Sequence, residues 1–346
     1  MKNFWSTFLA CLLALVVANV VIGVFLVMVL AGIGTLFSET VPDVQQKTVL
    51  RLDFAEPISD DPSRNPLSEM GFNDLISMRV ARNYALIDVL KAIETAATDD
   101  RISGIYLNVS PNMGMGMATL EEIRDALLQF KESGKFIVSY ADTQGSYYMA
   151  TAADKVYLNP QGNVTWLGLA SGVVFYKGLL DKLGVQVEAI RHGSFKSAVE
   201  PFILDKMSPE NRLQMDALLG SIWGHVVKRV SDARGIDSAQ LQRYASDLAL
   251  RSARNTVDLK MVDSLVYASD VERMLCEMTD RDEEPEFVSL GTYIDQPKTA
   301  VQKLSRNKIA VVYAEGQIVD GKSREGLIGG SSLAARLARV RTDDQV

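Results

Sequence analysis

At the centre of the sequence pattern stands Ile102-Ser103-Gly104-Ile105-Tyr106-Leu107-Asn108-Val109, a run dense in β-branched and aromatic residues that predicts a strand. A helix is predicted on each side of it. The preceding helix covers about residues 85–97, whose apolar residues fall on one face. The following helix is predicted to begin at Thr119, where Glu122 would complete a capping box. The run therefore lies within a helix–strand–helix pattern.

Three further segments near this run have the composition of strands. One alternates apolar with polar residues over 48–54, and the others cover 136–140 and 155–158. A short helix is expected at 145–153. Strands and helices thus alternate with short connections, which is typical of a parallel sheet covered by helices. The sequence predicts an α/β fold.

The second half of the chain is predicted to be mainly helical. Ser208-Pro209-Glu210 is a strong helix start, because it combines an N-cap hydroxyl, a first-turn proline and an acid near the positive end of the helix dipole. That helix is expected to run to about Ala233, just before Gly235. The other expected elements are helices at 177–183, 238–247 and 268–279, a strand at 185–191, and a charged linker at 280–286.

The C-terminal residues repeat the start of this α/β pattern. Residues 308–316 echo the strand at 48–56, down to the Ala-Glu pair that ends it. A predicted helix at 333–340 then leads into Thr342-Asp343-Asp344, as Thr98-Asp99-Asp100 leads into the central strand. We expect a second copy of the first domain to begin here. A parallel sheet left one strand into its copy cannot bury its faces, so we expect the chain to be a fragment of a longer protein.

The composition favours an acidic α/β protein and argues against several functions. A net charge of -7 offers no basic stripe, so no nucleic-acid partner is expected. Cys11 and Cys276 form no CxxC motif, and His192 and His225 are too few for a histidine-rich metal site. We therefore predict no disulfide framework, no metal and no cofactor.

An uncharged apolar run at residues 4–37 is long enough to span a bilayer. It exceeds the roughly 7–15 apolar residues of a signal peptide, so residues 1–40 are expected to form an uncleaved anchor in contact with lipid. Lys2 precedes the run, whereas Glu39 and Asp43 follow it. The positive-inside rule then places the N-terminus in the cytoplasm and the rest of the chain outside it.

The candidate for catalysis is the lysine in Arg191-His192-Gly193-Ser194-Phe195-Lys196-Ser197-Ala198-Val199-Glu200-Pro201-Phe202. Lysine has an ordinary pKa of about 10.4 and is a poor base at neutral pH unless desolvation lowers that pKa. Phe195, Ala198 and Val199 are expected to provide an apolar wall around Lys196. The alternative is a solvated surface lysine.

The anchor, the tandem α/β pattern and residues 193–202 together resemble the signal peptide peptidase SppA family, also called protease IV, in its long two-copy form. The family motif Gly-x-Phe/Tyr-Lys-Ser-Ala-x-Glu-Pro-Phe is matched in full. Tyr147-Tyr148, the turn at 159–162 and Met207-Ser208-Pro209 are also similar to that family. The resemblance implies a ClpP/crotonase-like spiral of ββα units.

The resemblance further implies a serine peptidase with a Ser-Lys dyad. Lys196 would be its general base, and the nucleophilic serine would come from the second copy, beyond Val346. At the nucleophile position of the first copy stands Gln144, and an amide is no nucleophile. The Met-rich loop at 108–114 likewise departs from the Asn-Ser-Pro-Gly-Gly loop that would help form an oxyanion hole.

The same resemblance implies a location, substrates and a domain plan. It implies a single-pass protein of the bacterial inner membrane, with its soluble part on the periplasmic side, that hydrolyses signal-peptide remnants and other peptides as a homo-oligomer. A first peptidase-like domain is expected at 41–290, and a linker with the start of a second at 291–346.

Other functions remain open on the sequence. Ser146 could attack within this chain with Lys196 or His192 as base, although it lies two residues past the nucleophile position. A crotonase-type hydratase or isomerase would need an acyl-CoA pocket and gives no reason for an anchor. The chain could also be a membrane-anchored scaffold or interaction module whose lysine is only structural.

Overall fold

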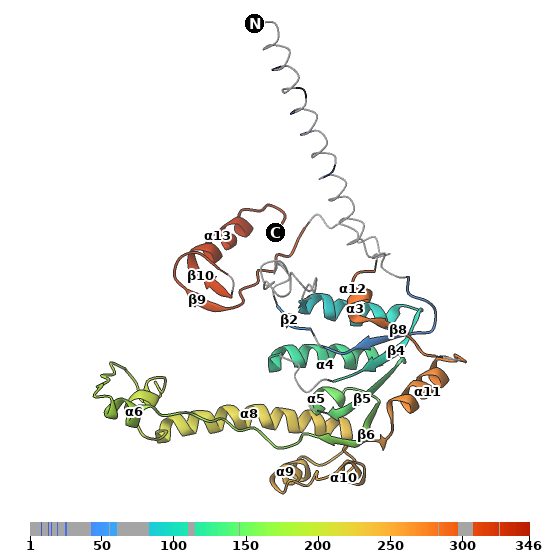
Figure 1. Ribbon diagram of the computed structural model, residues 1–346, viewed down its shortest axis with the longest axis horizontal. Helices are drawn as coiled ribbons and strands as arrows, with labels where there is room; N and C mark the ends of the chain where they lie inside the picture. The colour runs from blue at the N-terminus through green and yellow to red at the C-terminus, as the bar shows by residue number, and fades with distance from the viewer. Residues whose placement is uncertain are drawn as a thin grey trace. The chain divides into compact units, whose positions relative to one another are not determined.

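The structure is a computed structural model that describes most of the chain after the N-terminal region (Figure 1). The described residues are 8, 13, 15, 19, 25, 43–54, 56–60, 83–109, 115–144, 146–282, 284–296, 307–324 and 326–346. The chain divides into two compact units, Met1–Asp43 and Val44–Val346. The anchor predicted at 4–37 lies outside the described residues except at five single positions, so it stays a prediction. Within the described ranges, no helix combines the length and apolar character that a membrane span requires.

A parallel sheet, six-stranded in the described part of the chain, forms the centre of the second unit. Its strand order is β7-β6-β5-β4-β1-β8, and each neighbouring pair is parallel. The strands are β1 (Thr48–Leu52), β4 (Ile102–Leu107), β5 (Phe136–Gln144), β6 (Lys155–Val164), β7 (Ser264–Leu265) and β8 (Glu286–Ser289). The α/β prediction is confirmed, and the sheet fits a ClpP-like fold. The spiral of ββα units stays a prediction.

The linker predicted at 280–286 holds except at its last residue, because its described residues up to 285 lie in no helix or strand. The edge strand β8, which was not predicted, begins at Glu286 and pairs with β1. Val288 is buried in the main core, and Phe287 lies on the other face with its ring centroid 5.7 Å from that of Tyr106. Packing on both faces therefore fixes this strand, although its charged flank hides it in the sequence.

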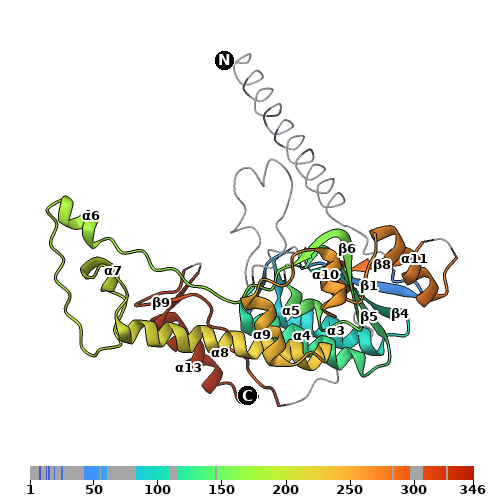
Figure 2. The same ribbon diagram turned by 90° about the horizontal axis from the view of Figure 1, so that it is seen from below.

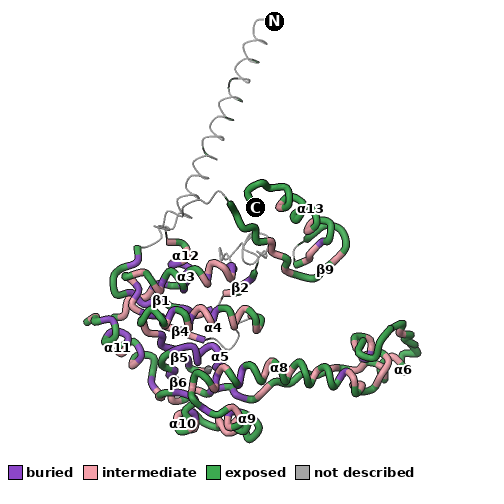
Figure 3. The backbone as a smooth tube through the Cα atoms, turned by 180° about the vertical axis from the view of Figure 1, so that it is seen from behind, coloured by how far each residue is buried: buried purple, intermediate pink, exposed green. Residues whose placement is uncertain are grey.

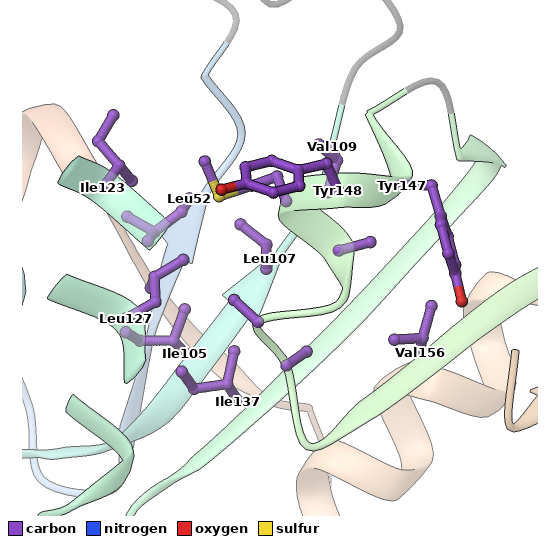
Figure 4. Close-up of a cluster of buried hydrophobic side chains, with 14 of the residues drawn as sticks. Leu52, Ile105, Leu107, Val109, Ile123, Leu127, Ile137, Tyr147, Tyr148 and Val156 are labelled. Atoms are coloured by element: carbon purple, nitrogen blue, oxygen red, sulfur yellow. The ribbon is translucent and has the colours of Figure 1, made fainter. Parts of the chain in front are cut away.

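The main hydrophobic core lies between the sheet and a layer of helices on one face. These helices are α3 (Leu86–Thr98), α4 (Met117–Lys131), α5 (Tyr147–Ala150), α12 (Leu290–Ile294) and the C-terminal half of α8. In Figure 4, Ile105 and Ile137 project from neighbouring strands toward Leu127 of α4. In Figure 3, buried residues are concentrated on the strands of the sheet, β5 and β6 above all. Most residues of the central run at 102–109 are buried because this layer of helices covers the sheet.

A second cluster covers the opposite face of the sheet. Val138, Tyr140 and Tyr157 of the strands pack there against Val271 and Leu275 of α11 (Ala268–Thr279). Side chains alternate between the faces of a strand, so Tyr140 lies on this face and Ile137 on the other. Two covered faces explain why neighbouring apolar residues of one strand, such as Ile137 and Val138 of β5, are buried on opposite sides of the sheet.

The start of α4 differs from the prediction. The helix begins at Met117, and its N-cap Gly116 makes no side-chain cap hydrogen bond. Thr119 and Glu122 lie inside the helix, so the capping box expected there is not formed. Met117 and Leu120 pack against the main core, which extends the helix beyond its expected first residue. Tertiary packing overrides the local signal here.

The long helix α8 (Pro209–Arg234) confirms its predicted start and end. The Ser208 side chain accepts a hydrogen bond from the Asn211 N–H at 3.1 Å, and Gly235 ends the helix at a φ of 64°, in the left-handed region. Two helices follow it, α9 (Ser238–Ser246) and α10 (Ala253–Asp258). The apolar side chains that α8 buries belong to its C-terminal half, and its N-terminal half projects beyond the core (Figure 2).

Residues 167–222, here called the arm, contain this projecting half together with α6 (Lys177–Lys182) and α7 (Glu200–Ile203). The helix predicted at 177–183 is confirmed as α6, but the strand predicted at 185–191 is not formed. Val185, Val187 and Ile190 are exposed, Ile190 by 99%. A strand needs a neighbour for its backbone groups, and no strand of the described chain pairs with this segment.

The C-terminal residues 307–346 repeat an arrangement found earlier in the chain. β9 (Gln317–Val319) pairs in parallel with β10 (Leu327–Gly329), and α13 (Gly330–Arg341) follows at once. Likewise, β2 (Ile58–Ser59) pairs in parallel with β3 (Tyr84–Ala85), and α3 follows at once. The same order of elements supports the predicted repeat, and the helix predicted at 333–340 lies within α13.

The strand predicted at 308–316 is not formed, in contrast to its counterpart β1. Ile309 is 94% exposed, and the segment pairs with no strand in the described part of the chain. β1 instead lies between β4 and β8, which satisfy its backbone and cover its side chains. The difference comes from neighbours and not from a lack of apolar residues, because 309–314 is apolar at every position.

Candidate functional site

Lys196 lies on an exposed loop of the arm, between α6 and α7. Lys196 is itself exposed. Phe195 is 53% exposed and Ala198 is exposed as well, whereas Val199 is half-buried. The apolar wall predicted around the lysine is therefore not formed within the described chain. The cause is the neighbourhood of the loop: α6 buries no residue, and α7 buries only Glu200. Nothing in the described chain therefore desolvates the amine.

Glu200 is the exception on this loop, because its side chain is 0% exposed. One carboxylate oxygen, Oε1, accepts a hydrogen bond from the Ser208 hydroxyl at 2.6 Å. The other oxygen, Oε2, accepts from the Ser208 N–H at 3.2 Å and from Asn211 Nδ2 at 2.9 Å. The carboxylate thus joins the loop to the first turn of α8.

The charge of Glu200 is kept by these donors. Burial by itself raises the pKa of the Glu200 carboxyl, but the hydrogen bonds from Ser208 and Asn211 outweigh it and hold the pKa below its usual value. Arg191 adds to this effect, with its guanidinium 3.6 Å from Oε1. Glu200 is therefore an anion at neutral pH.

Two further contacts hold backbone carbonyl groups, those of Lys196 itself and of the residue before it. Arg191 donates a hydrogen bond to the Lys196 carbonyl at 3.0 Å, and Gln214 of α8 donates to the Phe195 carbonyl at 3.0 Å. Gly193 has a φ of 96°, in the left-handed region that favours glycine, and its carbonyl accepts from the Lys196 N–H at 3.4 Å. The loop is exposed, yet its backbone is held at several points.

The residues expected at the nucleophile position lie at the sheet. Gln144 ends β5, and Ser146 is the N-cap of α5. The described contacts of Ser146 are local to α5, and none joins it to Lys196 or to the exposed His192. The segment between α6 and α7 lies far from α5 in both Figure 1 and Figure 2. The structure therefore does not bring the alternative Ser146 pair together. Most of the Met-rich loop at 108–114 lies outside the described residues.

A cavity of about 230 Å³ lies on the α11 face of the sheet. Its lining includes Arg51, Tyr106, Asn108, Tyr140 and Asp142, and includes neither Lys196 nor Ser146. Burial raises the pKa of Tyr106 to about 12, so its hydroxyl is protonated at neutral pH. Among the described residues, no group of three His, Cys, Asp or Glu side chains could hold a metal ion.

Reasoning from sequence missed the residues that hold the loop. No separate role was predicted for Glu200, Arg191 or Asn211, because charged and amide side chains in a polar segment are usually exposed to solvent. One signal was available: Glu200 precedes a strong N-cap, Ser208, by a spacing that lets the chain turn back on itself. The contact between Glu200 and Ser208 is visible only in the structure, which places the start of α8 beside Glu200.

Comparison with known proteins connects the loop with a family. A model of "Peptidase family S49" matches residues 129–280, which include β5, β6, the arm and α11. Protease 4 of Salmonella typhi is 34% identical over 338 residues, which cover 93% of this chain and 54% of the relative. The chain belongs to the SppA family of S49 peptidases.

Other SppA-family relatives show the same partial coverage. Protease 4 of Haemophilus influenzae is 32% identical over 286 residues, which cover 79% of this chain and 46% of the relative. The chloroplastic serine protease SPPA of Arabidopsis thaliana is 27% identical over 270 residues, or 77% of this chain and 40% of the relative. The chain spans about half the length of these curated relatives. The resemblance to the SppA family, drawn from the predicted anchor, the tandem pattern and residues 193–202 together, is thereby confirmed.

Proposed function

We propose that this SppA-family chain provides the general base of a membrane-anchored serine endopeptidase that hydrolyses signal-peptide remnants and other peptides. One observation carries the proposal: Lys196 lies in a fully matched family motif, on a loop whose backbone is held by a buried carboxylate. The position expected for a nucleophile in the same chain is Gln144, which cannot attack. We therefore assign the nucleophilic serine to a segment outside residues 1–346.

The proposed reaction follows the logic of a Ser-Lys dyad. The neutral Lys196 amine takes the proton of the serine hydroxyl while its oxygen attacks the peptide carbonyl. The resulting ammonium returns the proton to the leaving amine, and an acyl-enzyme remains. Water then attacks the acyl group, with the same lysine as base, and releases the second product. Each cycle breaks one amide bond, consumes one water molecule and leaves the lysine unchanged.

This chemistry needs a desolvated lysine, and the arm indicates how one could arise. Many large apolar side chains of the arm are exposed: Leu167, Leu169, Val174, Tyr176, Leu179, Leu183, Val185, Val187, Ile190, Phe195, Phe202, Leu213 and Leu218. Exposed apolar surface of this extent is typical of protein interfaces. We propose that further copies cover it in a homo-oligomer and enclose the amine, which would lower the lysine pKa.

The proposed location also rests on the sequence and on the family. The uncharged run at 4–37 would anchor a single-pass protein in the bacterial inner membrane, with residues after 40 on the periplasmic side. Such an enzyme would meet signal-peptide remnants in the membrane where secretion leaves them. No metal, cofactor or nucleic acid enters the proposal.

The test is Lys196→Ala in the intact protein, with peptide hydrolysis as the measurement. General acid–base catalysis contributes typically 10²–10⁴-fold, so we expect hydrolysis to fall by about 10³-fold or more. Folding should be unchanged, because the Lys196 side chain is exposed. Lys206→Ala removes another exposed lysine of the arm and is the matched control. Hydrolysis that persists in the Lys196 variant at the control rate would reject the dyad and favour a non-catalytic scaffold.

A further inference from the structure

The buried carboxylate of Glu200 has several polar partners, although it lies at the end of an exposed loop. Its two oxygens accept from the Ser208 hydroxyl, the Ser208 N–H and the Asn211 amide, all at the N-terminus of α8. Arg191, nine residues earlier, lies 3.6 Å from the same carboxylate. The two ends of the loop that carries Lys196 therefore meet at one anion.

Arg191 also reaches the lysine itself. Its Nη1 donates to the Lys196 carbonyl at 3.0 Å and is the atom nearest the Glu200 carboxylate. A guanidinium holds several donors in a rigid planar fork, so it can contact the carboxylate and the carbonyl together. The chain of contacts runs from α8 through Glu200 and Arg191 to the backbone of Lys196.

We propose that Glu200 is a positioning residue that sets the place of the Lys196 amine through Arg191 and the first turn of α8. The inference rests on the proposed function, since the lysine needs a fixed place only if it serves a reaction. Glu200 itself touches neither substrate nor the reacting atoms. It acts by holding the backbone from which the lysine side chain extends.

The donors at this site favour a carboxylate. All the partners of Glu200 are donors, and an ionised carboxylate is a pure acceptor. A glutamine would point its NH₂ group either at the Ser208 hydroxyl and Arg191 or at the Ser208 N–H and Asn211. In the first orientation the Ser208 hydroxyl could accept from the NH₂ group, but the Arg191 guanidinium would face it donor to donor. In the second, the Ser208 N–H and the Asn211 amide would both face a donor in a buried place, where an unmade hydrogen bond is costly. The variant of choice is therefore Glu200→Gln, which preserves volume and removes the anion.

A matched control is available on the same arm. Glu188 is exposed and has no polar contact among those described, so Glu188→Gln makes the same chemical change without the network. The readout of position is backbone hydrogen exchange in the intact protein. The amides of Glu200, Phe202 and Leu204 donate hydrogen bonds to the backbone in or next to α7 and should be partly protected.

We expect Glu200→Gln to speed exchange of these amides and to leave β5 and β6 as protected as in the Glu188→Gln protein. In peptide hydrolysis, kcat should fall by about 10²-fold with KM within about two-fold, because a displacement of about 1 Å can cost that factor without changing substrate contacts. Exchange and kcat that both match the Glu188→Gln control would overturn the proposal. Faster exchange with unchanged kcat would also overturn it, because the loop would then be held without effect on the lysine.

Two further outcomes are separated by design. If Lys196→Ala retains full hydrolysis, the proposed function fails, and this failure is visible independently of the exchange result. If Glu200→Gln loses protection in β5 as well, the whole protein has unfolded, and Arg191→Gln decides instead. That variant leaves the contacts among Glu200, Ser208 and Asn211 in place and removes the link to the Lys196 carbonyl. It should lower kcat in the same sense, and an unchanged kcat would contradict the proposal.

Discussion

The parallel sheet and the arm treat their apolar side chains in opposite ways. Ile105 of β4 is fully buried in the main core, whereas Ile190 of the arm is almost fully exposed. Within this chain, β1 and β5 pair with β4, and the helices α3 and α4 cover its apolar side chains. The arm holds its backbone through a few polar contacts and presents its apolar surface outward. We infer that the sheet serves stability, whereas the exposed apolar surface of the arm serves as an interface.

The largest effect should come from the buried side of this comparison. Ile105→Ala removes a fully buried side chain and leaves a cavity in the main core. We expect a loss of about 2–5 kcal/mol in the free energy of unfolding, measured by urea denaturation. Ile190→Ala truncates the same residue type on the arm and is the control. Equal losses for both variants would show that the arm is packed as tightly as the sheet.

A smaller effect is expected at the edge of the core, where Asp99 joins two helices. Hydrogen bonds from Arg101 lower the pKa of Asp99 to about 2, and Tyr293 of α12 donates to the same carboxylate at 2.9 Å. Because this folded-state pKa lies below the ordinary value of 3.8, the stabilisation is complete above about pH 4. It is lost as the pH falls toward 2, and it amounts to about 2 kcal/mol.

Asp99→Asn tests this pH dependence. The variant should lose about 2 kcal/mol in the free energy of unfolding at pH 7 and little at about pH 2, measured by urea denaturation at both values. Asp100→Asn changes the exposed neighbouring acid and should match the parent at both. An Asp99 variant whose deficit does not shrink in acid would show that the Arg101 contact contributes nothing through charge.

The smallest effect on stability should come from the exposed side of the comparison. Ile190→Ser removes an apolar side chain that touches little within the chain, so the free energy of unfolding should change by less than about 0.5 kcal/mol. If further copies cover the arm, the same variant should weaken self-association in sedimentation velocity. A stability loss as large as that of Ile105→Ala would remove the distinction between the two regions.

The sequence predicts the sheet well and the site only in part, for one physical reason. Strands such as 102–109 carry their environment in their composition, since a strand covered on both faces is rich in apolar residues. The segments 185–191 and 308–316 also carry several apolar residues, yet neither forms a strand, because a strand exists only beside another strand. The motif identifies Lys196 and the family. It does not reveal that Glu200 is buried or that Arg191 reaches the lysine carbonyl, because those contacts depend on where α8 begins in space.

The lack of an apolar wall around Lys196 likewise shows that the burial of a side chain depends on neighbours in space, which the motif does not reveal. Phe195 and Ala198 are present at the expected positions, but their side chains are exposed and desolvate nothing within this chain. A dyad lysine needs surroundings that the arm does not provide by itself. We therefore expect the groups that complete a dyad, the nucleophilic serine first among them, to come to the arm from elsewhere.

The most direct test of this claim is to locate the reactive serine. The intact protein would be labelled with a fluorophosphonate probe, which bonds to activated serine hydroxyls, and the modified peptide identified by mass spectrometry. We predict a single labelled serine outside residues 1–346, with labelling lost in the Lys196→Ala protein and retained in the Lys206→Ala protein. A label on Ser146, or a label that persists without Lys196, would contradict the account.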